Sequence, residues 1–412
     1  MGTQARHGRL RRRGAARAIV SGTAIALAVV LISGTSVAGY AVWQLSNNLK
    51  PGVDISYPGG GAPPAVGAIE GPVNILLVGS DSGGGDVATF GKRGENLNDV
   101  TMLLHISPVS HVAIAVSLPR DMYVPISGCS HSPGTRKINE ALTNGGLACA
   151  VSTVSALTGL DIGYAAEIQF QGVIGMSDAI GGVDVCVGKP IHDLQISFNL
   201  SAGEHTLQGF DALQFLRSRH GIYGGSDTSR ISNQQLFLSA LMRKVKSKDV
   251  LSNPITLYKL ANAATANMTL STSLNHLDTM VSIAAALKDV SLSNMVFAQY
   301  PTGSTTVNGV GGLLPRKADA QVLMNAIAAD QPVVVAGVGG GTIAGDNVVE
   351  TPSPAPTATG GASGSGGSGA PSGSGASATP TTPPQTGGPV TLPRSITGQA
   401  ATEQTCSSGQ TF

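Results

Sequence analysis

The chain has 412 residues, a formal net charge of +1 and a charged content of only 12%. Arginines in residues 1–17 supply the positive balance, so the remainder is mildly acidic. This distribution argues against nucleic-acid binding through bulk electrostatics, and any basic site beyond residue 17 must be local.

An uncharged apolar run follows this basic arm, from Ala18 to about Trp43. It is long enough to span a bilayer, which takes about 20 residues. The basic flank predicts that residues 1–17 stay in the cytoplasm and that the remainder faces outward. The alternative is a cleavable signal peptide, because Ser36-Val37-Ala38 looks like a cleavage site. The run exceeds the usual signal core of about 7–15 residues, which favours a retained transmembrane helix over residues 18–43.

Composition divides the rest of the chain into three parts. Residues 44–71 are interpreted as a short linker. Residues 72–330 alternate apolar periodic segments with turns and are enough for one large domain. Residues 346–412 are dominated by Pro, Gly, Ser and Thr, which cannot bury a core, so we expect a disordered tail.

Within the domain, short and continuously apolar segments are typical of buried strands, at residues 73–81, 100–107, 112–118, 164–170 and 182–187. Helical periodicity marks about residues 146–158, 171–180, 207–214, 229–247, 253–267, 273–288 and 318–329. Helices interleaved with such strands predict an α/β fold, a layered α-β-α sandwich with a central mixed sheet.

Two carboxylates flank the gap between the first two strands. Asp81 ends the first strand, and Asp99 lies at the start of the second. If these strands pair antiparallel, the two carboxylates converge at the mouth of the connecting loop. Mg²⁺ is usually held by one or two carboxylates, with water and phosphate as the other ligands. Taken alone, each residue is better explained as a turn cap or a solvated acid.

Arg120 follows directly after the third strand, where ligands bind in open α/β sheets. Cysteines fit an oxidising compartment: Cys129 and Cys149 could close a loop of about twenty residues, worth roughly 3 kcal/mol in the chain-entropy model. For Cys186 a buried thiol is favoured over a bridge to Cys406 in the tail. No cysteine or histidine spacing indicates zinc.

Three more arginines lie in "LRSRHGIYGGSDTSRISNQQ", residues 216–235. Arg217 and Arg219 are two apart and would point to one side of an extended segment. Arg230 follows Ser229, a plausible helix N-cap, and has Gln234 one turn later. A helix start favours anions, and the planar guanidinium suits phosphate.

Only nine arginines follow residue 17, and four of them lie at predicted element ends. This distribution argues against independent surface charges. Together with the two carboxylates, these arginines predict a pyrophosphate site with its metal. The alternative is a purely structural cluster of charges.

Seven motifs follow one another over about residues 72–245: "NILLVGSD", "NDVTMLLHI", "VSLPRDMYVPI", "KINEALTNGG", "IGGVDVCV", "LSAGEHTLQGFDALQFLRSR" and "SRISNQQ". Together and in this order they resemble the LytR-CpsA-Psr family of cell-envelope enzymes. The resemblance implies a membrane-anchored phosphotransferase of actinobacterial type on the cell-wall side. Such an enzyme moves a glycopolymer from a polyprenyl pyrophosphate carrier to peptidoglycan and forms a phosphodiester bond. Arabinogalactan, teichoic acid and capsule are all open as the polymer.

The same resemblance assigns roles to the polar residues. Asp81 and Asp99 would hold Mg²⁺ or Mn²⁺ and form the catalytic centre with Arg120. The prenyl tail would lie in an apolar cavity beneath the sheet. The pyrophosphate would be bound by Arg120, Arg217, Arg219, Arg230 and Gln234.

The sequence also departs from the family pattern. The family usually has an arginine two residues before the second acid, where this chain has Leu97. Lys92 or Arg93 could replace that contact. Actinobacterial members often carry a further cysteine in the region of Glu204, so Cys186 lacks its expected partner.

Asp99 and Asp121 are both open as the base for the acceptor hydroxyl, whereas His105 and His111 are more typical of structural residues. Two other functions are consistent with the same site. A lipid pyrophosphate phosphatase would use water as the acceptor, and a non-catalytic wall-anchoring module would bind a polyanionic polymer.

Overall fold

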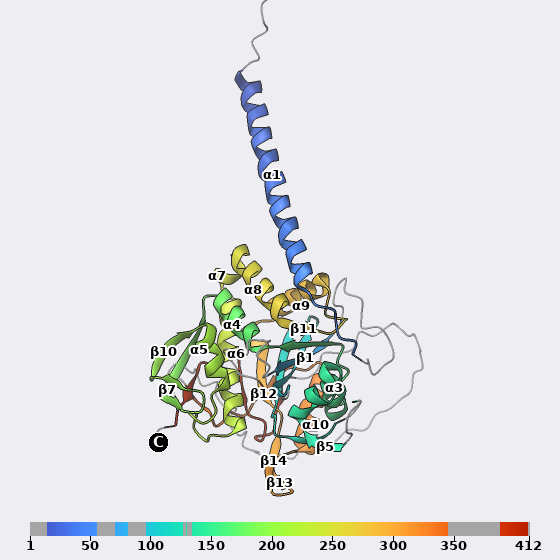
Figure 1. The fold of residues 1–412 in the computed structure, drawn as a ribbon, viewed down its shortest axis with the longest axis vertical. Helices are drawn as coiled ribbons and strands as arrows, with labels where there is room; N and C mark the ends of the chain where they lie inside the picture. The colour runs from blue at the N-terminus through green and yellow to red at the C-terminus, as the bar shows by residue number, and fades with distance from the viewer. Residues whose placement is uncertain are drawn as a thin grey trace, which may run out of the picture.

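A mixed sheet of seven strands forms the centre of the computed structural model (Figure 1). The structure describes residues 15–55, 71–80, 96–126, 129, 134–344 and 388–410. The strand order is β11 (Met268–Leu270), β6 (Tyr164–Ile168), β1 (Val73–Ser80), β2 (Asn98–Ser107), β3 (Val112–Leu118), β12 (Met295–Gln299) and β18 (Gly398–Ala400). Strand β2 pairs antiparallel with both β1 and β3, whereas β6 runs parallel to β1 and β12 runs parallel to β3. The predicted central mixed sheet is confirmed.

Alternate residues of the central strands enter two separate cores, because successive side chains of a strand point to opposite faces. Leu76 and Val78 pack in one core with α3 (Ala141–Thr158) and α10 (Lys317–Ala328). Ile75 and Met102 pack in the other core, with α9 (Leu277–Asp289). Both faces are covered by helices, so the near-continuous apolar pattern of these strands follows from burial on both sides.

A second, four-stranded sheet lies beside α6 (Asp227–Val245), in the order β10 (Gly203–Leu207), β7 (Val183–Lys189), β19 (Thr405–Ser408), β16 (Thr342–Ala344). Its inner face packs on α5 (Gly209–Arg217) and α6 through a third core. The remaining strands form two-stranded sheets: β4 (Tyr123–Ile126) with β5 (Gly134–Lys137), β8 (Ile191–Asp193) with β9 (Phe198–Leu200), β13 (Thr302–Val307) with β14 (Val310–Pro315), and β15 (Val333–Val334) with β17 (Val390–Thr391). Further helices of the described domain are α4 (Phe170–Ala179), α7 (Lys248–Leu251), α8 (Pro254–Asn267) and the 3₁₀ turns η1 (Ile138–Glu140) and η2 (Leu292–Asn294).

The C-terminal segment 388–410 is folded, so the expectation that residues 346–412 are disordered is wrong for this part. Its strands β17, β18 and β19 join three different sheets. Leu392, Ile396 and Ala401 are buried. These apolar residues are spaced among Pro, Gly, Ser and Thr, and the composition of the whole tail concealed them. The folded domain therefore extends past residue 330, and residues 345–387 lie outside the described part of the chain.

Two disulfides close the domain. The predicted Cys129–Cys149 bridge is present, with a Cα–Cα distance of 5.0 Å. Cys186 is bonded to Cys406, so the prediction of a buried thiol without a partner is wrong. The physical reason is the parallel pairing of β19 with β7, which places Cys406 opposite Cys186 across 220 residues of chain.

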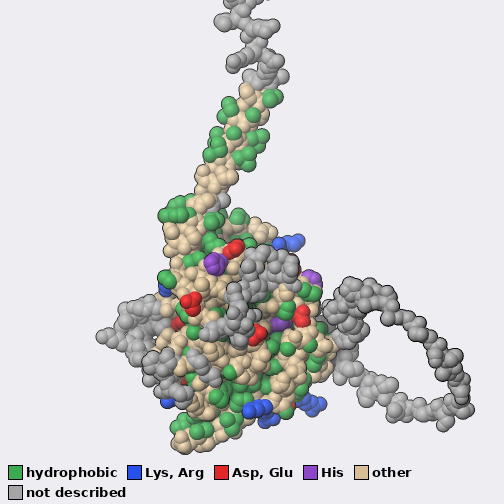
Figure 2. Space-filling model, turned by 90° about the vertical axis from the view of Figure 1, so that its right-hand side faces the viewer, with side chains coloured by type: hydrophobic (Ala, Val, Ile, Leu, Met, Phe, Trp, Pro, Cys, Tyr) green, Lys and Arg blue, Asp and Glu red, His purple; other side chains and the backbone are tan. Residues whose placement is uncertain are grey.

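Helix α1 (Ala15–Asn48) projects from the domain and, among the described residues, is the one helix long and apolar enough to cross a membrane (Figure 1). Figure 2 shows hydrophobic side chains along its surface. The helix continues past the predicted end at residue 43, because its last turn contacts α8. Gln44 Oε1 accepts a hydrogen bond of 2.7 Å from Tyr258, and Asn48 Nδ2 donates to Asn262 at 2.9 Å. Residues 44–48 are therefore helix and not linker.

Candidate active site

Asp99 lies in a β-bulge at the end of the β1–β2 pair. Gly79 pairs with Val100 and Ser80 pairs with Asn98, so Asp99 is the extra residue between them. Bulges redirect a side chain out of the regular alternation of a strand. Gly79 is required opposite the bulge, because a Cβ atom there would lie 2.9 Å from Val100 Cβ. Strands β1 and β2 pair antiparallel, so the condition under which the two carboxylates were expected to converge is met.

Asp81 lies outside the described residues, so its approach to Asp99 stays a prediction. The same holds for Lys92 and Arg93. The neighbour of Asp81, Ser80, is buried at the same end of the sheet as Asp99.

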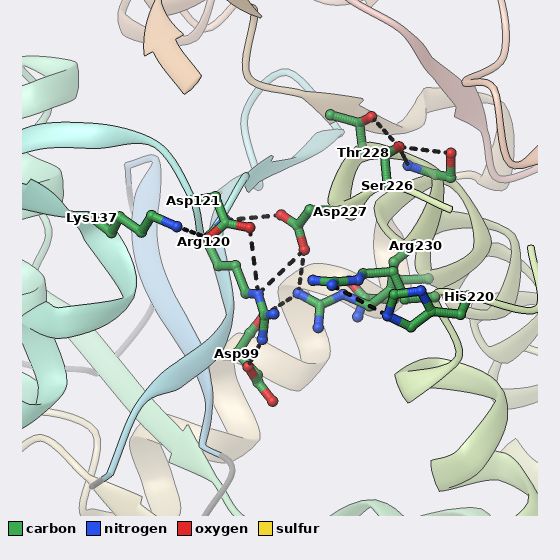
Figure 3. A network of polar contacts seen from close by, with 12 residues as sticks. Asp99, Arg120, Asp121, Lys137, His220, Ser226, Asp227, Thr228 and Arg230 are labelled. Atoms are coloured by element: carbon green, nitrogen blue, oxygen red, sulfur yellow. Dashed lines mark hydrogen bonds and ion pairs between the residues drawn. The ribbon is translucent and has the colours of Figure 1, made fainter. Parts of the chain in front are cut away.

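Arg120 connects three carboxylates at the end of β3 (Figure 3). Its Nη1 donates to Asp99 Oδ1, and its Nε lies 3.7 Å from Asp227 Oδ1 and 3.8 Å from Asp121 Oδ2. Its backbone N–H donates to Asp227 Oδ2 at 3.1 Å. Burial opposes the charge, but the carboxylates of Asp99, Asp227 and Asp121 outweigh burial and raise the pKa of Arg120. Arg120 is therefore a fixed cation.

Helix α6 places Arg230 and Gln234 beside this cluster. Ser226, not Ser229, is the N-cap, because the Ser226 hydroxyl accepts from the backbone N–H of Ser229. Arg230 Nη2 lies 2.6 Å from Asp227 Oδ1 and donates to the backbone carbonyl of Asp99 at 2.7 Å. Arg230 is buried, and this burial, which Asp227 opposes, lowers the pKa of its guanidinium. Gln234, one turn after Arg230, donates from Nε2 to the backbone carbonyl of Leu216 at 3.0 Å.

The loop between α5 and α6 carries the other two arginines. Arg217 is the last residue of α5, so it does not form an extended pair with Arg219 as the spacing suggested. The Arg217 guanidinium lies 4.7 Å from the centre of the Phe170 ring. The loop after Arg217 wraps around the Asp193 carboxylate, which accepts backbone N–H bonds from Arg219, His220 and Gly221.

Burial opposes the charge on Asp193, but these backbone bonds prevail and lower its pKa. Asp193 therefore stays ionised and fixes the start of the arginine loop. Arg219 contacts His220 Nε2 at 3.3 Å and lies close enough to Asp121 to lower the pKa of that carboxyl.

An apolar cavity of about 830 Å³, open solvent at its mouth included, lies below the cluster. Its walls come from β1, β2, α4, α5 and α6, and its apolar lining includes Leu77, Val100, Met102, Ile168, Phe170, Val173, Leu213, Leu216 and Leu238. Asp99, Arg217, Arg230 and Gln234 line it as well. The structure thus brings Asp99 and three of the predicted phosphate-binding residues to one cavity. The arrangement suits a ligand with an anionic head and an apolar tail.

Asp227 is the principal residue that the sequence analysis missed. Its carboxylate is buried, contacts both Arg120 and Arg230, and occupies the first position of α6. The Gly-Gly-Ser-Asp sequence was the available signal, because a serine cap followed by an acid is typical of a helix start. Asp121, considered only as a base, is held by Lys137 Nζ at 2.8 Å.

Asp121 is a poor base in this setting. Burial raises the pKa of its carboxyl, but Lys137, Arg120 and Arg219 outweigh burial and lower it. His105 is buried away from the cluster, and its ring contacts Asn74 at 2.8 Å and Asp330 at 3.2 Å.

The oxygen ligands that the site offers can be compared with those that a divalent cation needs. Among the described residues, no group of three or more His, Cys, Asp or Glu side chains could hold a metal ion. Asp99 presents a carboxylate on the cavity wall, whereas Asp81 lies outside the described residues. In phosphate sites Mg²⁺ is usually held by one or two carboxylates, with water and substrate oxygens as the other ligands, so the chemistry of the Asp99 carboxylate fits the ion.

Comparisons with known proteins identify the family of this chain and its relatives. The model of the LytR_cpsA_psr family matches residues 47–328. The chain is 29% identical over 324 residues to the cell wall biosynthesis protein LcpA of Corynebacterium glutamicum, covering 70% of this chain and 60% of that protein. It is 33% identical over 185 residues to the polyisoprenyl-teichoic acid–peptidoglycan teichoic acid transferase TagU of Bacillus mycoides, covering 44% of this chain and 55% of that protein. The chain therefore spans a little over half the length of these relatives.

Solved structures share the fold. The LytR-Csp2A-Psr enzyme from Actinomyces oris superposes with a TM-score of 0.52 at 21% identity, covering 68% of this chain and 96% of that one. TagV of B. subtilis superposes with a TM-score of 0.52 at 22% identity, covering 63% of this chain and 97% of that one.

Proposed function

The chain belongs to the LytR_cpsA_psr family, and we propose that it is a membrane-anchored transferase that moves a glycopolymer from a polyprenyl pyrophosphate carrier to peptidoglycan. The observation that carries the proposal is that Asp99, Arg217 and Arg230 line a largely apolar cavity, with Arg120 bound to Asp99. The name of the relative TagU supplies the classes of donor and acceptor, a polyisoprenyl-linked polymer and peptidoglycan.

The two halves of the donor match the two halves of the site. Each buried CH₂ group of a prenyl chain contributes about 0.8 kcal/mol, so the apolar cavity favours the tail. Arg120, Arg217 and Arg230 supply fixed positive charge for the diphosphate, and Arg219 and Gln234 lie beside them. Ordering these guanidinium groups before the substrate binds makes them more effective than mobile cations would be.

In the proposed reaction an acceptor hydroxyl oxygen attacks the phosphorus that carries the polymer. The phosphoanhydride bond breaks, and polyprenyl phosphate leaves with the negative charge of the broken bond. The arginines stabilise that charge as it grows on the bridging and non-bridging oxygens. Asp81 and Asp99 would hold Mg²⁺ or Mn²⁺, which polarises phosphoryl oxygens when bound. Lys137 and Arg120 keep Asp121 ionised, so its first role is that of a counter-charge.

The membrane helix fits the location of such substrates. We assign α1 as a retained anchor, with the arginines of residues 1–17 on the cytoplasmic side and the domain on the wall side. The close contact of the last turn of α1 with α8 holds the domain near the bilayer, where the lipid donor resides.

The experiment is an assay of the full-length protein in detergent with a polyprenyl pyrophosphate oligosaccharide, a soluble peptidoglycan oligosaccharide and Mg²⁺. The expected product joins the two saccharides through a phosphodiester and releases polyprenyl phosphate. Release of a saccharide phosphate to water alone would indicate the lipid pyrophosphate phosphatase. Binding of the saccharide without turnover, unaffected by Asp99→Asn, would indicate a wall-anchoring module.

A further inference from the structure

A second cavity lies on the other side of Arg120 from the apolar one. It is a cleft of about 1050 Å³, open solvent at its mouth included, and Asp121 and Asp227 form part of its wall. Figure 3 shows Asp99 on one side of the Arg120 guanidinium and Asp121, Asp227 and Thr228 on the other. The charged cluster therefore separates an apolar cavity from a second, polar one.

The lining of this cleft is polar. Among the described residues that line it, Asp121 and Asp227 carry the only charges. Its other polar side chains are hydroxyls and an amide, which both donate and accept hydrogen bonds, and include Ser226, Thr228, Gln299, Ser304, Ser395 and Thr397. Without a lysine or arginine the cleft does not suit a second phosphate, whereas sugar hydroxyls and acetamido groups match its partners.

The geometry of phosphoryl transfer connects the two cavities. The attacking and leaving oxygens lie roughly in line on opposite sides of the phosphorus. With the prenyl tail in the apolar cavity, polyprenyl phosphate leaves on the Asp99 side of the cluster. The attacking hydroxyl must then approach from the side of Asp121 and Asp227, where the polar cleft lies.

We propose that the polar cleft is the acceptor subsite and that it binds an uncharged stretch of a peptidoglycan saccharide. This inference rests on the proposed function. A new bond forms between the acceptor oxygen and phosphorus, and the bond from phosphorus to the bridging oxygen breaks. The hydroxyl proton leaves to water, because Lys137, Arg120 and Arg230 hold the Asp121 and Asp227 carboxylates as counter-charges.

The position of the cleft in the molecule agrees with this role. The β13–β14 hairpin, which supplies part of the lining, lies at the end of the domain away from α1 (Figure 1). An acceptor in the cell wall would reach the domain from that side. Gly340, Ser395 and Thr397 line the cleft and lie beyond the family match at residues 47–328. The C-terminal segment, tied down by the Cys186–Cys406 bridge, therefore contributes to the cleft from outside the part of the chain that the family model matches.

Two glycines allow the cleft to be narrowed without disturbing the fold. Gly311 and Gly340 line it, and a Cβ atom added at either position meets nothing within 4 Å. Gly337 lies in the same loop as Gly340, is equally open to a new side chain, and does not line the cleft. Gly337→Leu is therefore the matched control for Gly340→Leu.

The test measures both substrates with the full-length protein in detergent, using a polyprenyl pyrophosphate disaccharide as donor and a peptidoglycan tetrasaccharide as acceptor. Gly340→Leu and Gly311→Leu are expected to raise the KM for the acceptor by about tenfold, equivalent to about 1.4 kcal/mol. The KM for the donor should not change, which also reports that the fold is retained. Gly337→Leu should leave both values unchanged.

The outcomes separate this inference from the proposed function. An unchanged acceptor KM in both cleft variants, with wild-type transfer intact, would overturn the acceptor subsite and leave the transferase standing. A rise in the donor KM alone would assign the cleft to the donor saccharide and also overturn the inference. A wild-type protein that releases polymer to water and never to the tetrasaccharide would refute both proposals.

Discussion

Replacement of Arg120 should reduce turnover far more than it reduces stability. Arg120→Ala removes the group that contacts Asp99, Asp121 and Asp227 at once. Two of these carboxylates keep another cation, since Lys137 lies 2.8 Å from Asp121 and Arg230 lies 2.6 Å from Asp227. The Arg120 side chain is also 23% exposed, so water can replace part of the lost contact.

The magnitudes follow from these contacts. Loss of one partner of a fully buried ion pair costs about 3–5 kcal/mol, and the remaining cations and the exposure reduce the expected loss of stability to about 1–2 kcal/mol. Loss of one preorganised group that stabilises transition-state charge lowers kcat by about 10²–10³-fold. Arg120→Lys keeps the positive charge but loses the planar guanidinium group with its paired N–H donors. Compared with Arg120→Ala, it should therefore restore more of the stability than of the turnover.

The assay combines kcat/KM for the lipid-linked donor with urea unfolding of the same full-length samples. Arg136→Ala serves as the control, because Arg136 pairs with Glu140 on the surface at 3.2 Å and its side chain is 44% exposed. The control should lose about 0.3–0.5 kcal/mol of stability and no activity. Turnover of Arg120→Ala within threefold of the control would refute the role of Arg120 in the reaction.

Four further changes test other parts of the site and fold. Asp227→Asn leaves the buried Arg230 and the partly buried Arg120 with less compensating charge and should lower the free energy of unfolding in urea by about 2–4 kcal/mol. A loss below about 0.5 kcal/mol would show that the cluster does not depend on Asp227. The Asp121 carboxyl has a lowered pKa, so its stabilisation is present above its unfolded pKa, 3.8, and is lost as the pH falls through the lower folded value. Asp121→Asn should therefore show a weaker loss of stability between pH 5 and the acid limit than the wild type, and an identical pH profile would contradict the assignment. Removal of the 186–406 bridge by Cys186→Ser with Cys406→Ser should lower the free energy of unfolding by up to about 5 kcal/mol in the chain-entropy model. Removal of the bridge that closes the shorter 129–149 loop should lower it by about 3 kcal/mol. The variant without the 186–406 bridge should therefore unfold at the lower urea concentration of the two. Val173→Trp fills the apolar cavity and should raise the KM for a long-chain donor but not for one with a short prenyl chain; equal effects on both would place the tail elsewhere.

Local patterns predicted the central strands and most helices. The segments that became β1, β2, β3 and β6 are continuously apolar because both faces of the sheet are covered, and that pattern is visible in a short window of sequence. The helix limits were recovered to within a few residues for α4, α8 and α10. Strand and helix positions of this kind depend on residues that are close together in the sequence, so they can be predicted from the sequence alone.

Features that depend on distant pairing were not predicted. The bridge between Cys186 and Cys406 follows from the register of β7 with β19, which only the folded sheet determines. The bulge at Asp99 likewise arises from the register of β1 against β2. Asp227 was overlooked because its role comes from contacts with Arg120, more than a hundred residues away in sequence. Arginine clustering was detectable because the chain has so few arginines.

The central claim is that one polyprenyl diphosphate binds with its head at the arginines and its tail in the apolar cavity. Photolabelling tests it most directly, with a polyprenyl pyrophosphate that carries a diazirine in its prenyl chain and mass spectrometry to locate the adduct. The account predicts labels on the cavity wall, at Val173, Leu213 or Leu238, which an excess of unlabelled lipid prevents and Arg230→Met weakens. Labels confined to α1 or scattered over the surface, with the cavity wall unmodified, would contradict it.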